Sequence, residues 1–298
     1  MTKEKDNQFH NSTVYIGSFD SLEDFLFYVR DENVNSMFAN IMSSKNGSYN
    51  FTGTNSYQEA WNLCRYTMDE GFSQFLEKFD FLNYYIDTQY KIENNYSVSG
   101  FAPSIPRYLL NIPTSMYYHV TKDIPTVNIY MNYAYSASVS KKAVEHRGII
   151  VLNLIQHLEK SGYKVNFYGF DLSHSRFYSE LLFMEVPLKK EYEQLNLKTL
   201  YFPLVHPSFL RRLFFRAEEK MPLTLKEWVD GYGFPSNYKE SVEFLEYYKK
   251  LKNAGQVIYI SSPDELGIKG DDLRKDCNEV ISKLNSQCLD IGKQKIKR

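Results

Sequence analysis

The sequence lacks the usual signatures of nucleotide-binding, zinc-binding and membrane-spanning proteins. It contains neither a Walker phosphate loop nor a Gly-x-Gly-x-x-Gly stretch, and no pair of cysteines has zinc-site spacing. No apolar run reaches the roughly 18 residues that a membrane-spanning helix needs. These absences exclude the common nucleotide and zinc enzymes, and we expect neither a cofactor nor a membrane partner.

Cysteine is scarce, with Cys64, Cys277 and Cys288 far apart in the chain. An odd number at such spacing argues against a disulfide framework, and the polar N-terminal segment lacks the apolar core of a secretory signal. We therefore expect a cytoplasmic protein whose cysteines are buried or surface thiols. A thiol nucleophile needs a base and positive charge nearby, and the sequence places neither beside these residues.

An excess of charge of either sign is also missing, since 35 basic residues oppose 36 acidic ones. Proteins that bind duplex nucleic acid usually have a basic face, so nucleic acid is not an expected partner. Aromatic residues, in contrast, are abundant, with 25 Tyr and 21 Phe. Exposed Tyr and Phe suit a protein interface. Codon usage in an AT-rich genome would give the same composition, and the sequence leaves both explanations open.

The length of 298 residues allows one large domain or two ordinary ones. We predict a flexible arm over residues 1–13, a helix-rich N-terminal region over 14–98 and an α/β domain over 99–298. The Pro-rich start of this domain, 99–125, breaks helices but carries too many apolar side chains for a free linker. We expect it to pack across the sheet as a covering segment.

Helix-start signals mark the N-terminal region. Ser21 precedes two acidic residues and can cap a helix. Ser56 and Glu59 have the spacing of a capping box, in which each side chain satisfies a backbone amide at the start of a helix. A third, aromatic helix is predicted over residues 71–90, and a short strand over 49–52.

The most informative stretch covers residues 126–171 and predicts a β-α-β unit. An apolar strand precedes a long helix over 141–160, and a second strand covers 164–168. Two strands joined in this way lie parallel in one sheet. The strand at 180–186 follows after little chain, which favours an antiparallel neighbour.

The remaining segments alternate between strand and helix patterns. Such alternation is typical of an α/β fold with a mostly parallel sheet flanked by helices. Further predicted strands cover 197–205 and 256–261, and further predicted helices cover 208–220, 237–254 and 271–287. A short helix and loop are predicted over 222–232.

The loop after the first central strand is rich in serine. Ligands of open α/β sheets bind at the carboxyl ends of strands where the strand order reverses. The order of elements is vWA- or Rossmann-like, and von Willebrand factor A (vWA) domains carry an Asp-x-Ser-x-Ser metal site at this position. The resemblance places Asn132 at the Asp, Ala134 at the first Ser and Ser136 at the second. Because an amide lacks the charge that magnesium prefers, we predict a degenerate site without a metal.

Other polar residues should lie at the same edge of the sheet. Asp171 begins the stretch DLSHS after the second strand, and His206 follows the strand predicted at 197–205. The candidate cleft comprises Asn132, Ser136, Ser138, Asp171 and His206.

A hydrolase is one interpretation of this cleft, although triad partners usually come from separate loops and no Gly-x-Ser-x-Gly elbow is present. We therefore assign no catalytic residue. The simpler interpretations are a polar loop at DLSHS and a helix cap at Ser138 or Ser140.

The helix predicted over 208–220 combines arginines with phenylalanines. Arg212 and Arg216 share one face of it, with Phe215 beside them, and arginine with aromatic residues is common at protein interfaces. We take Arg212, Phe215 and Arg216 as a candidate interface. An amphipathic helix with a solvated basic side would give the same pattern.

Three stretches resemble an uncharacterised protein family found in bacteriophages and prophages. They are SYQEAWNLCRYT from Ser56, SGFAPSIPRYLLNIPTSMY from Ser99 and VNIYMNYAYSASVSKKAVEHRGIIVLNLIQHLEKSGYKVNFYGF from Val127. The resemblance covers about residues 56–170 and supplies no catalytic residues. It implies a phage-encoded protein that acts in the cytoplasm of a host cell.

These observations together lead us to expect an accessory protein that acts by protein–protein binding. Its expected partner is a host protein or complex, such as the nuclease–helicase of a Gabija-like anti-phage defence, which it would inhibit. We also expect a homo-oligomer. Two alternatives stay open: a hydrolase or nucleic-acid-processing enzyme with a site at the sheet edge, and a component of virion assembly.

Overall fold

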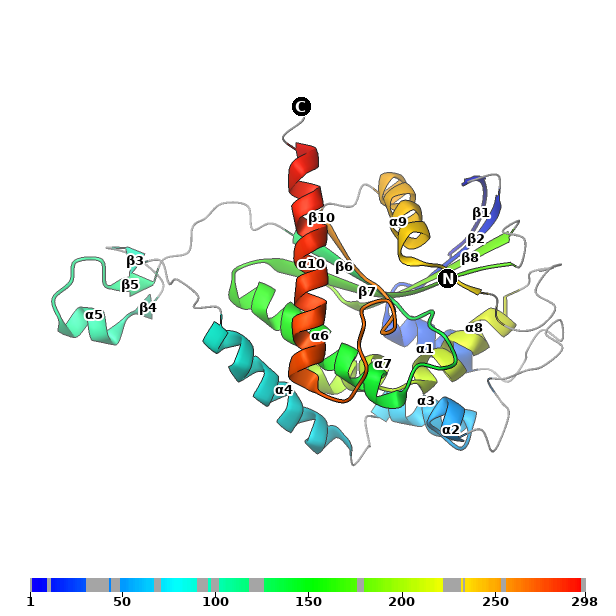
Figure 1. Cartoon of the computed structure of the whole chain (residues 1–298), viewed down its shortest axis with the longest axis horizontal. Helices are drawn as coiled ribbons and strands as arrows, with labels where there is room; N and C mark the ends of the chain where they lie inside the picture. The colour runs from blue at the N-terminus through cyan, green and yellow to red at the C-terminus, as the bar shows by residue number, and fades with distance from the viewer. Residues whose placement is uncertain are drawn as a thin grey trace.

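The computed structural model describes residues 2–9, 12–30, 43, 49–66, 71–89, 96–97, 102–117, 126–175, 180–221, 232, 234–252 and 256–295. Its centre is a mixed β-sheet with the strand order β1-β2-β8-β7-β6-β10, and β9 lies beside β7 (Figure 1). The strands of this sheet are β1 (Thr2–Phe9), β2 (Ser12–Ser18), β6 (Thr126–Asn132), β7 (Lys164–His174), β8 (Glu180–Lys189), β9 (Phe234–Pro235) and β10 (Gln256–Ile260).

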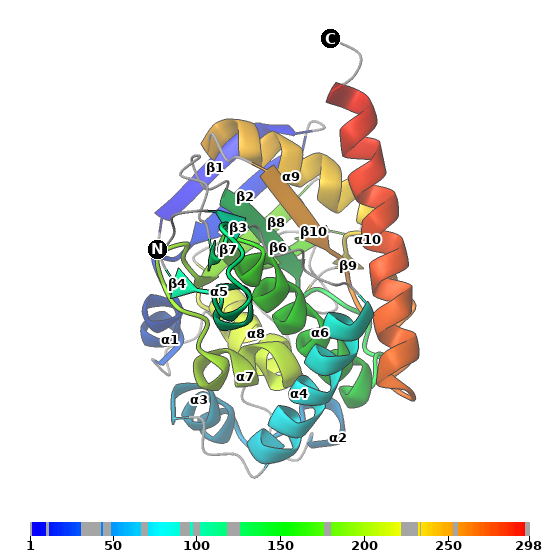
Figure 2. The same ribbon diagram turned by 90° about the vertical axis from the view of Figure 1, so that its left-hand side faces the viewer.

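Helices surround the sheet, and most of them lie on one of its faces (Figure 2). The N-terminal helices are α1 (Leu22–Arg30), α2 (Tyr49–Thr52), α3 (Tyr57–Tyr66) and α4 (Gly71–Gln89). The later helices are α6 (Lys141–Lys160), α7 (Leu197–Val205), the π-helix η1 (Phe209–Phe214), α8 (Phe215–Glu219), α9 (Tyr238–Lys252) and α10 (Leu273–Lys295).

The predicted β-α-β unit is confirmed. Strands β6 and β7 are parallel, with Ile129 opposite Phe167, and α6 joins them over the predicted residues. Strand β10 adds a further parallel neighbour on the other side of β6. Strand β8 is antiparallel to β7, as its short connection predicted, and it pairs in parallel with β2. The chain therefore has the predicted α/β fold with a mixed, mostly parallel core.

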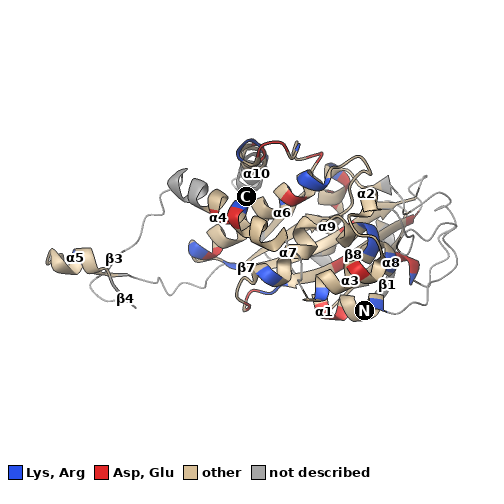
Figure 3. Cartoon of the chain, turned by 90° about the horizontal axis from the view of Figure 1, so that it is seen from below, with Lys and Arg blue, Asp and Glu red and all other residues tan. Residues whose placement is uncertain are grey.

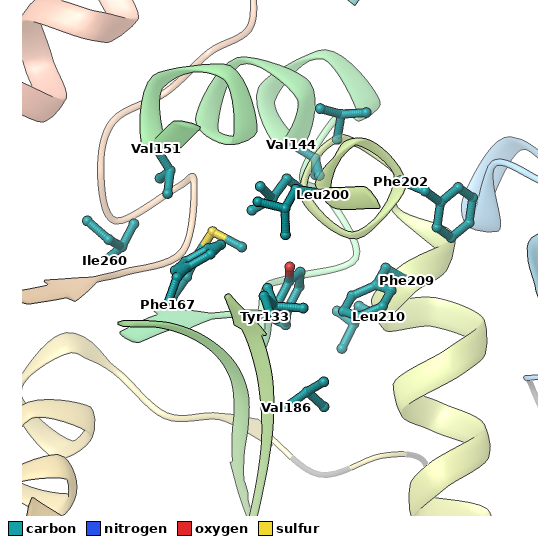
Figure 4. Close-up of a cluster of buried hydrophobic side chains, with 14 of the residues drawn as sticks. Tyr133, Val144, Val151, Phe167, Val186, Leu200, Phe202, Phe209, Leu210 and Ile260 are labelled. Atoms are coloured by element: carbon teal, nitrogen blue, oxygen red, sulfur yellow. The ribbon is translucent and has the colours of Figure 1, made fainter. Parts of the chain in front are cut away.

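Side chains alternate between the two faces of the sheet because successive strand residues point in opposite directions. Figure 4 shows Phe167 and Val186 of the sheet facing Val144 and Val151 of α6 and Leu200 of α7. On the opposite face, α9 packs a second apolar cluster against the sheet. Helices cover both faces of the sheet, which explains why the sequences of the central strands are continuous apolar runs.

The predicted caps form at the helix starts. Ser140 accepts a hydrogen bond from the Ala143 amide, 3.1 Å away, at the start of α6. At α3, Ser56 accepts from the Glu59 amide, as a capping box requires. The Glu59 carboxylate reaches back one residue further than expected and accepts from the Asn55 amide at 2.7 Å.

Two predicted strands are helices in the structure. Residues 197–205 form α7, whose start is capped by Asn196 through hydrogen bonds from the amides of Lys198 and Thr199. Its side chains from Leu200 onward are all buried. A helix buried on every side has no polar stripe, so its apolar run cannot be told from a strand. The strand predicted over 49–52 is the short helix α2.

The N-terminal region contributes to the same sheet and core as the rest of the chain. Strand β1 covers most of the predicted flexible arm and pairs antiparallel with β2, which suits a polar edge strand. Helices α1, α3 and α4 place Phe25, Trp61 and Phe75 in the larger apolar cluster with the central strands. The short helix and loop predicted over 222–232 lie outside the described residues except for Tyr232.

Residues 102–117 form a small unit that stands away from the main sheet, which we call the projection (Figure 1). Its strands β4 (Ala102–Pro103) and β5 (Met116–Tyr117) pair antiparallel, and β5 also pairs with β3 (Tyr96–Ser97). The short helix α5 (Ile105–Leu109) lies between β4 and β5. The covering segment expected over 99–125 thus leaves its apolar helix exposed instead of packing it on the sheet.

Charged residues of both signs are interspersed along the body of the molecule (Figure 3). This distribution agrees with the near-zero net charge of the sequence. Within the described ranges, no helix combines the length and the apolar character that a membrane crossing requires.

Candidate functional site

The strand order reverses at β6. Helix α6 connects β6 to β7, its neighbour on one side, and β10 is its neighbour on the other side. A ligand of an α/β sheet would bind between the carboxyl ends of β6 and β10. The structure fills this position with Arg147 of α6, which is 0% exposed. Its Nη1 donates to the carbonyl oxygens of Asn132, at 2.6 Å, and Ser261, at 3.3 Å.

The surroundings of Arg147 are largely apolar. The guanidinium lies 5.8 Å from the Tyr133 ring centre and 5.6 Å from that of Tyr135. Burial lowers the pKa of Arg147, and the two tyrosines partly oppose this. Its Nε and Nη2 have no hydrogen-bond partner within the described part of the chain. The expected ligand position therefore holds a cation that belongs to the protein itself.

Asn132 stabilises the Ser-rich loop instead of facing a cleft. Its side chain is fully buried, and its Oδ1 accepts from the Ala134 amide at 2.8 Å. Its Nδ2 donates to the hydroxyls of Tyr259, at 3.4 Å, and Ser241, at 3.5 Å. Burial raises the pKa of Tyr259 to about 12, so this hydroxyl remains protonated at neutral pH.

Two serines of the loop, Ser136 and Ser138, lie at the surface. Ser136 and Ser138 are exposed, and their hydroxyls are 2.9 Å apart. Ser138 also lines a cavity of about 510 Å³ beside the start of α6. Across the ranges that the structure describes, no group of three or more His, Cys, Asp or Glu side chains is arranged to hold a metal ion.

Asp171 lies within β7, because this strand continues to His174, so the polar loop predicted at DLSHS is strand in all but its last residue. The Asp171 carboxylate is buried and accepts from Ser173 Oγ at 2.8 Å. The carboxyl group of Glu218 in α8, also buried, lies close enough to interact with it electrostatically. Burial, together with the nearby Asp171 charge, raises the pKa of Glu218 well above its ordinary value. Burial beside Asp171 therefore favours the protonated, neutral form of Glu218.

His206 ends α7 and does not follow a strand. The ring is buried and stacks on Phe202 with 4.6 Å between ring centres. Its Nδ1 accepts from the Ser208 amide at 3.2 Å. Of the five residues of the candidate cleft, Ser138 alone lines the cavity, so the structure does not bring the five together in one site.

The two arginines of the candidate interface are buried inside the protein. Arg212 is fully buried and donates to Ser43 O at 2.7 Å and to Thr54 Oγ1 at 2.8 Å. Arg216 is buried beside the Tyr57 ring, with its guanidinium 4.1 Å from the ring centre, and Phe215 stacks on Tyr232. Both interpretations from the sequence, an interface and a solvated basic side, are wrong for these arginines. They connect α8 and η1 to the N-terminal region.

The two described cysteines are unsuited to nucleophilic chemistry. Cys64 and Cys277 are buried and unpaired with each other as free thiols. Burial raises the pKa of both thiols, that of Cys277 to about 11. The side chain of Cys288 lies outside the described residues.

Three residues that define this edge of the sheet were not predicted as site residues from the sequence: Arg147, Arg211 and Glu218. Arg147 stands out only as a charge at the start of the apolar run GIIVLNLI. Arg211 lines the cavity, whereas the pattern had selected its neighbour Arg212. Such partners come from distant segments, which spacing along the chain does not encode.

The fold and this edge define an α/β protein with a mixed sheet whose strand-order reversal is filled by a buried arginine. The chain belongs to the family described as domain of unknown function DUF7192, whose pattern matches residues 3–287. No curated protein matches the chain. No solved structure matches it either.

Proposed function

We propose that this protein acts by binding another protein through the projection. The observation that supports this is a group of large apolar side chains exposed side by side on and next to α5. Leu109 and Leu110 are 74% and 72% exposed, and Ile105 and Tyr108 are about as exposed. Contiguous exposed apolar surface of this kind marks interaction sites, because water contact with it is unfavourable.

The backbone of the projection holds these side chains in a defined arrangement. Ser104 N donates to Ser115 O at 2.7 Å, which closes the base of the unit. Arg107 donates from Nε and Nη2 to the carbonyl and hydroxyl oxygens of Thr114, at 2.8 and 2.9 Å. Asn111 adopts a left-handed conformation that ends the helical turn. A rigid apolar turn suits insertion into an apolar groove of the partner.

The test compares two exposed apolar sites of equal exposure. Leu109→Asp with Leu110→Asp should abolish recovery of a stoichiometric partner by the tagged protein from its native cells. Phe27→Asp, at a position on α1 that is 72% exposed, should leave recovery unchanged. Equal recovery by all three proteins, or no stoichiometric partner with the unchanged protein, would contradict the proposal. Sedimentation of the purified protein distinguishes a second copy of the chain from a different partner.

More specifically, we propose that this protein is a bacteriophage accessory protein and that it inhibits a host defence complex in the host cytoplasm. The support is the resemblance to a phage and prophage family together with the proposed binding surface. Phage plating on cells that carry a Gabija-like nuclease–helicase should rise when this protein is produced, and the Leu109→Asp, Leu110→Asp variant should not raise it. Unchanged plating would contradict inhibition of a Gabija-like complex, but it would not contradict binding to another protein through the projection.

The two alternatives have less support. A hydrolase would need Asp171 or His206 to reach a substrate, whereas both are buried and hydrogen bonded within the chain. A role in virion assembly predicts the protein in purified particles, and its detection there by mass spectrometry would favour that alternative.

A further inference from the structure

A cavity of about 510 Å³ lies where the start of α6 meets α2 and the segment after α7. Its volume is within the range of small-molecule sites and exceeds the needs of a single inorganic ion. Arg211, Lys141, Ser138, Tyr49 and Phe51 are among its lining residues. Among the lining residues that the structure describes, none is Asp or Glu. The cavity therefore combines positive charge, hydroxyl groups and aromatic rings.

Arg211 carries a charge that has no counter-ion in the part of the chain that the structure describes. It is 4% exposed. Its guanidinium donates to four carbonyl oxygens: Phe51 at 2.5 Å, Ser136 at 3.4 Å, and Ala137 and Val139 at 3.3 Å each. These neutral acceptors orient the group without neutralising it. A buried charge of this kind is costly until an anion approaches it.

Burial lowers the pKa of Arg211, with the nearby Tyr135 as the partly opposing influence. The Phe51 ring lies 4.4 Å from the guanidinium carbon and the Tyr135 ring 5.2 Å from it. Arginine remains protonated at any physiological pH even with a lowered pKa. The rings and carbonyls thus hold a permanent positive charge at the wall of the cavity.

The start of α6 adds a second source of positive potential. The helix is 20 residues long, its first turn contains no acidic residue, and Ser140 caps it. Lys141 and Lys142 begin this turn, and both are exposed, but Lys141 alone lines the cavity. The backbone amides and dipole at a helix start favour an anion, most of all a phosphate.

Aromatic side chains supply a surface for the rest of a ligand. Tyr49 is 49% exposed at the cavity, and Phe51 lies against Arg211. Planar groups of small molecules stack on such rings. The lining therefore differs from a simple ion site in both size and chemistry.

We propose that this cavity binds a phosphate-bearing small molecule, with the phosphate group held by Arg211, Lys141, Ser138 and the start of α6. The remainder of the ligand packs against Tyr49 and Phe51. This site is independent of the projection, so neither proposal depends on the other.

Calorimetric titration with AMP, inorganic phosphate and adenosine at constant ionic strength tests the assignment. AMP should bind saturably, phosphate more weakly, and adenosine not measurably. Lys141→Gln should weaken AMP binding about tenfold, because a charge-assisted hydrogen bond is lost. Lys142→Gln removes an equivalent charge from the same turn outside the cavity and should leave the affinity unchanged.

A second variant tests the site without removing a buried side chain. Ser138→Glu places a carboxylate at the cavity, on an exposed loop. It should abolish AMP binding and raise the melting temperature of the ligand-free protein, because it compensates the Arg211 charge. The proposal is overturned by the absence of phosphate and AMP binding, by adenosine binding as tight as AMP, by equal effects of the two lysine variants, or by unchanged AMP binding in Ser138→Glu.

Discussion

Arg147, Arg211 and Arg212 are buried in the same manner, with guanidinium groups that donate to backbone carbonyl oxygens. The planar fork of arginine reaches several carbonyls at once, and lysine cannot reproduce this geometry. Each arginine joins segments that are far apart in the sequence. At the scale of single residues, buried charge therefore organises the carboxyl edge of the sheet, and in Arg211 it leaves a cation facing a cavity.

The carboxyl pair Asp171 and Glu218 gives a pH dependence at the same scale. The folded pKa of Glu218 is raised by burial and by Asp171, so the folded protein retains a proton that the unfolded chain releases above its ordinary pKa of 4.5. Stability is then complete below this value and declines as the pH rises toward the folded pKa. The expected slope is about 1.4 kcal/mol per pH unit for one proton.

Glu218→Gln should reduce this decline, because the amide is neutral at every pH and releases no proton on unfolding. Denaturant unfolding between pH 5 and 8 should show a smaller loss of stability in the variant than in the unchanged protein. Glu246→Gln, at an exposed position of α9, serves as the control and should keep the original pH dependence. Parallel stability curves for all three proteins would contradict the raised pKa of Glu218 in the folded protein.

Helices α6 and α7 show how closely two elements approach in this fold. A Cβ atom at Gly148 of α6 would overlap the backbone carbonyl of Leu204 in α7. The hydroxyl of Tyr133 donates to Pro203 O at 2.9 Å, which ties α7 to the Ser-rich loop. At the scale of elements, one glycine sets the distance between the two helices that cover the sheet.

Gly148→Ala should destabilise the protein by about 1–3 kcal/mol, since backbone atoms on the other side of the contact cannot rotate away. Alanine in an unconstrained helix would have the opposite effect, because it favours helix formation. Gly162→Asn is the control: its backbone is left-handed, which Asn tolerates, and nothing lies near its Cβ position. Chemical denaturation measures both variants, and a neutral or stabilising Gly148→Ala would contradict the contact.

The N-terminal helices and the central strands share the larger apolar cluster, although the sequence suggested a separate N-terminal region. Trp61 of α3 donates from Nε1 to Leu26 O at 3.0 Å and packs in the cluster that includes Phe167 of β7. Arg212 and Arg216 connect Ser43 and α3 to the helices that follow α7. Elements with a common core should unfold together.

A Trp228→Phe variant leaves Trp61 as the remaining tryptophan and reports on the N-terminal region. Its fluorescence and the far-ultraviolet circular dichroism of the whole chain should change at the same denaturant concentration. Two separated midpoints would show that the N-terminal region unfolds independently. The exposed projection contributes little to either signal, so it does not obscure the comparison.

Local patterns in the sequence determined the β-α-β unit, its helix bounds and the caps at Ser56 and Ser140. These features depend on neighbouring residues, because periodicity and capping act over a few positions. The same patterns failed at α7, where burial on all sides removes the polar stripe that distinguishes a helix from a strand.

Only the tertiary structure decided the character of the candidate site. The serine loop and Asp171 lie at the predicted edge, but the structure places Arg147 in the crevice, pairs Asp171 with Glu218 and turns Arg212 inward. Each of these outcomes depends on which distant carbonyl or carboxylate meets a charged group after folding. A buried charge must find its partners in space. Spacing along the chain does not contain that information.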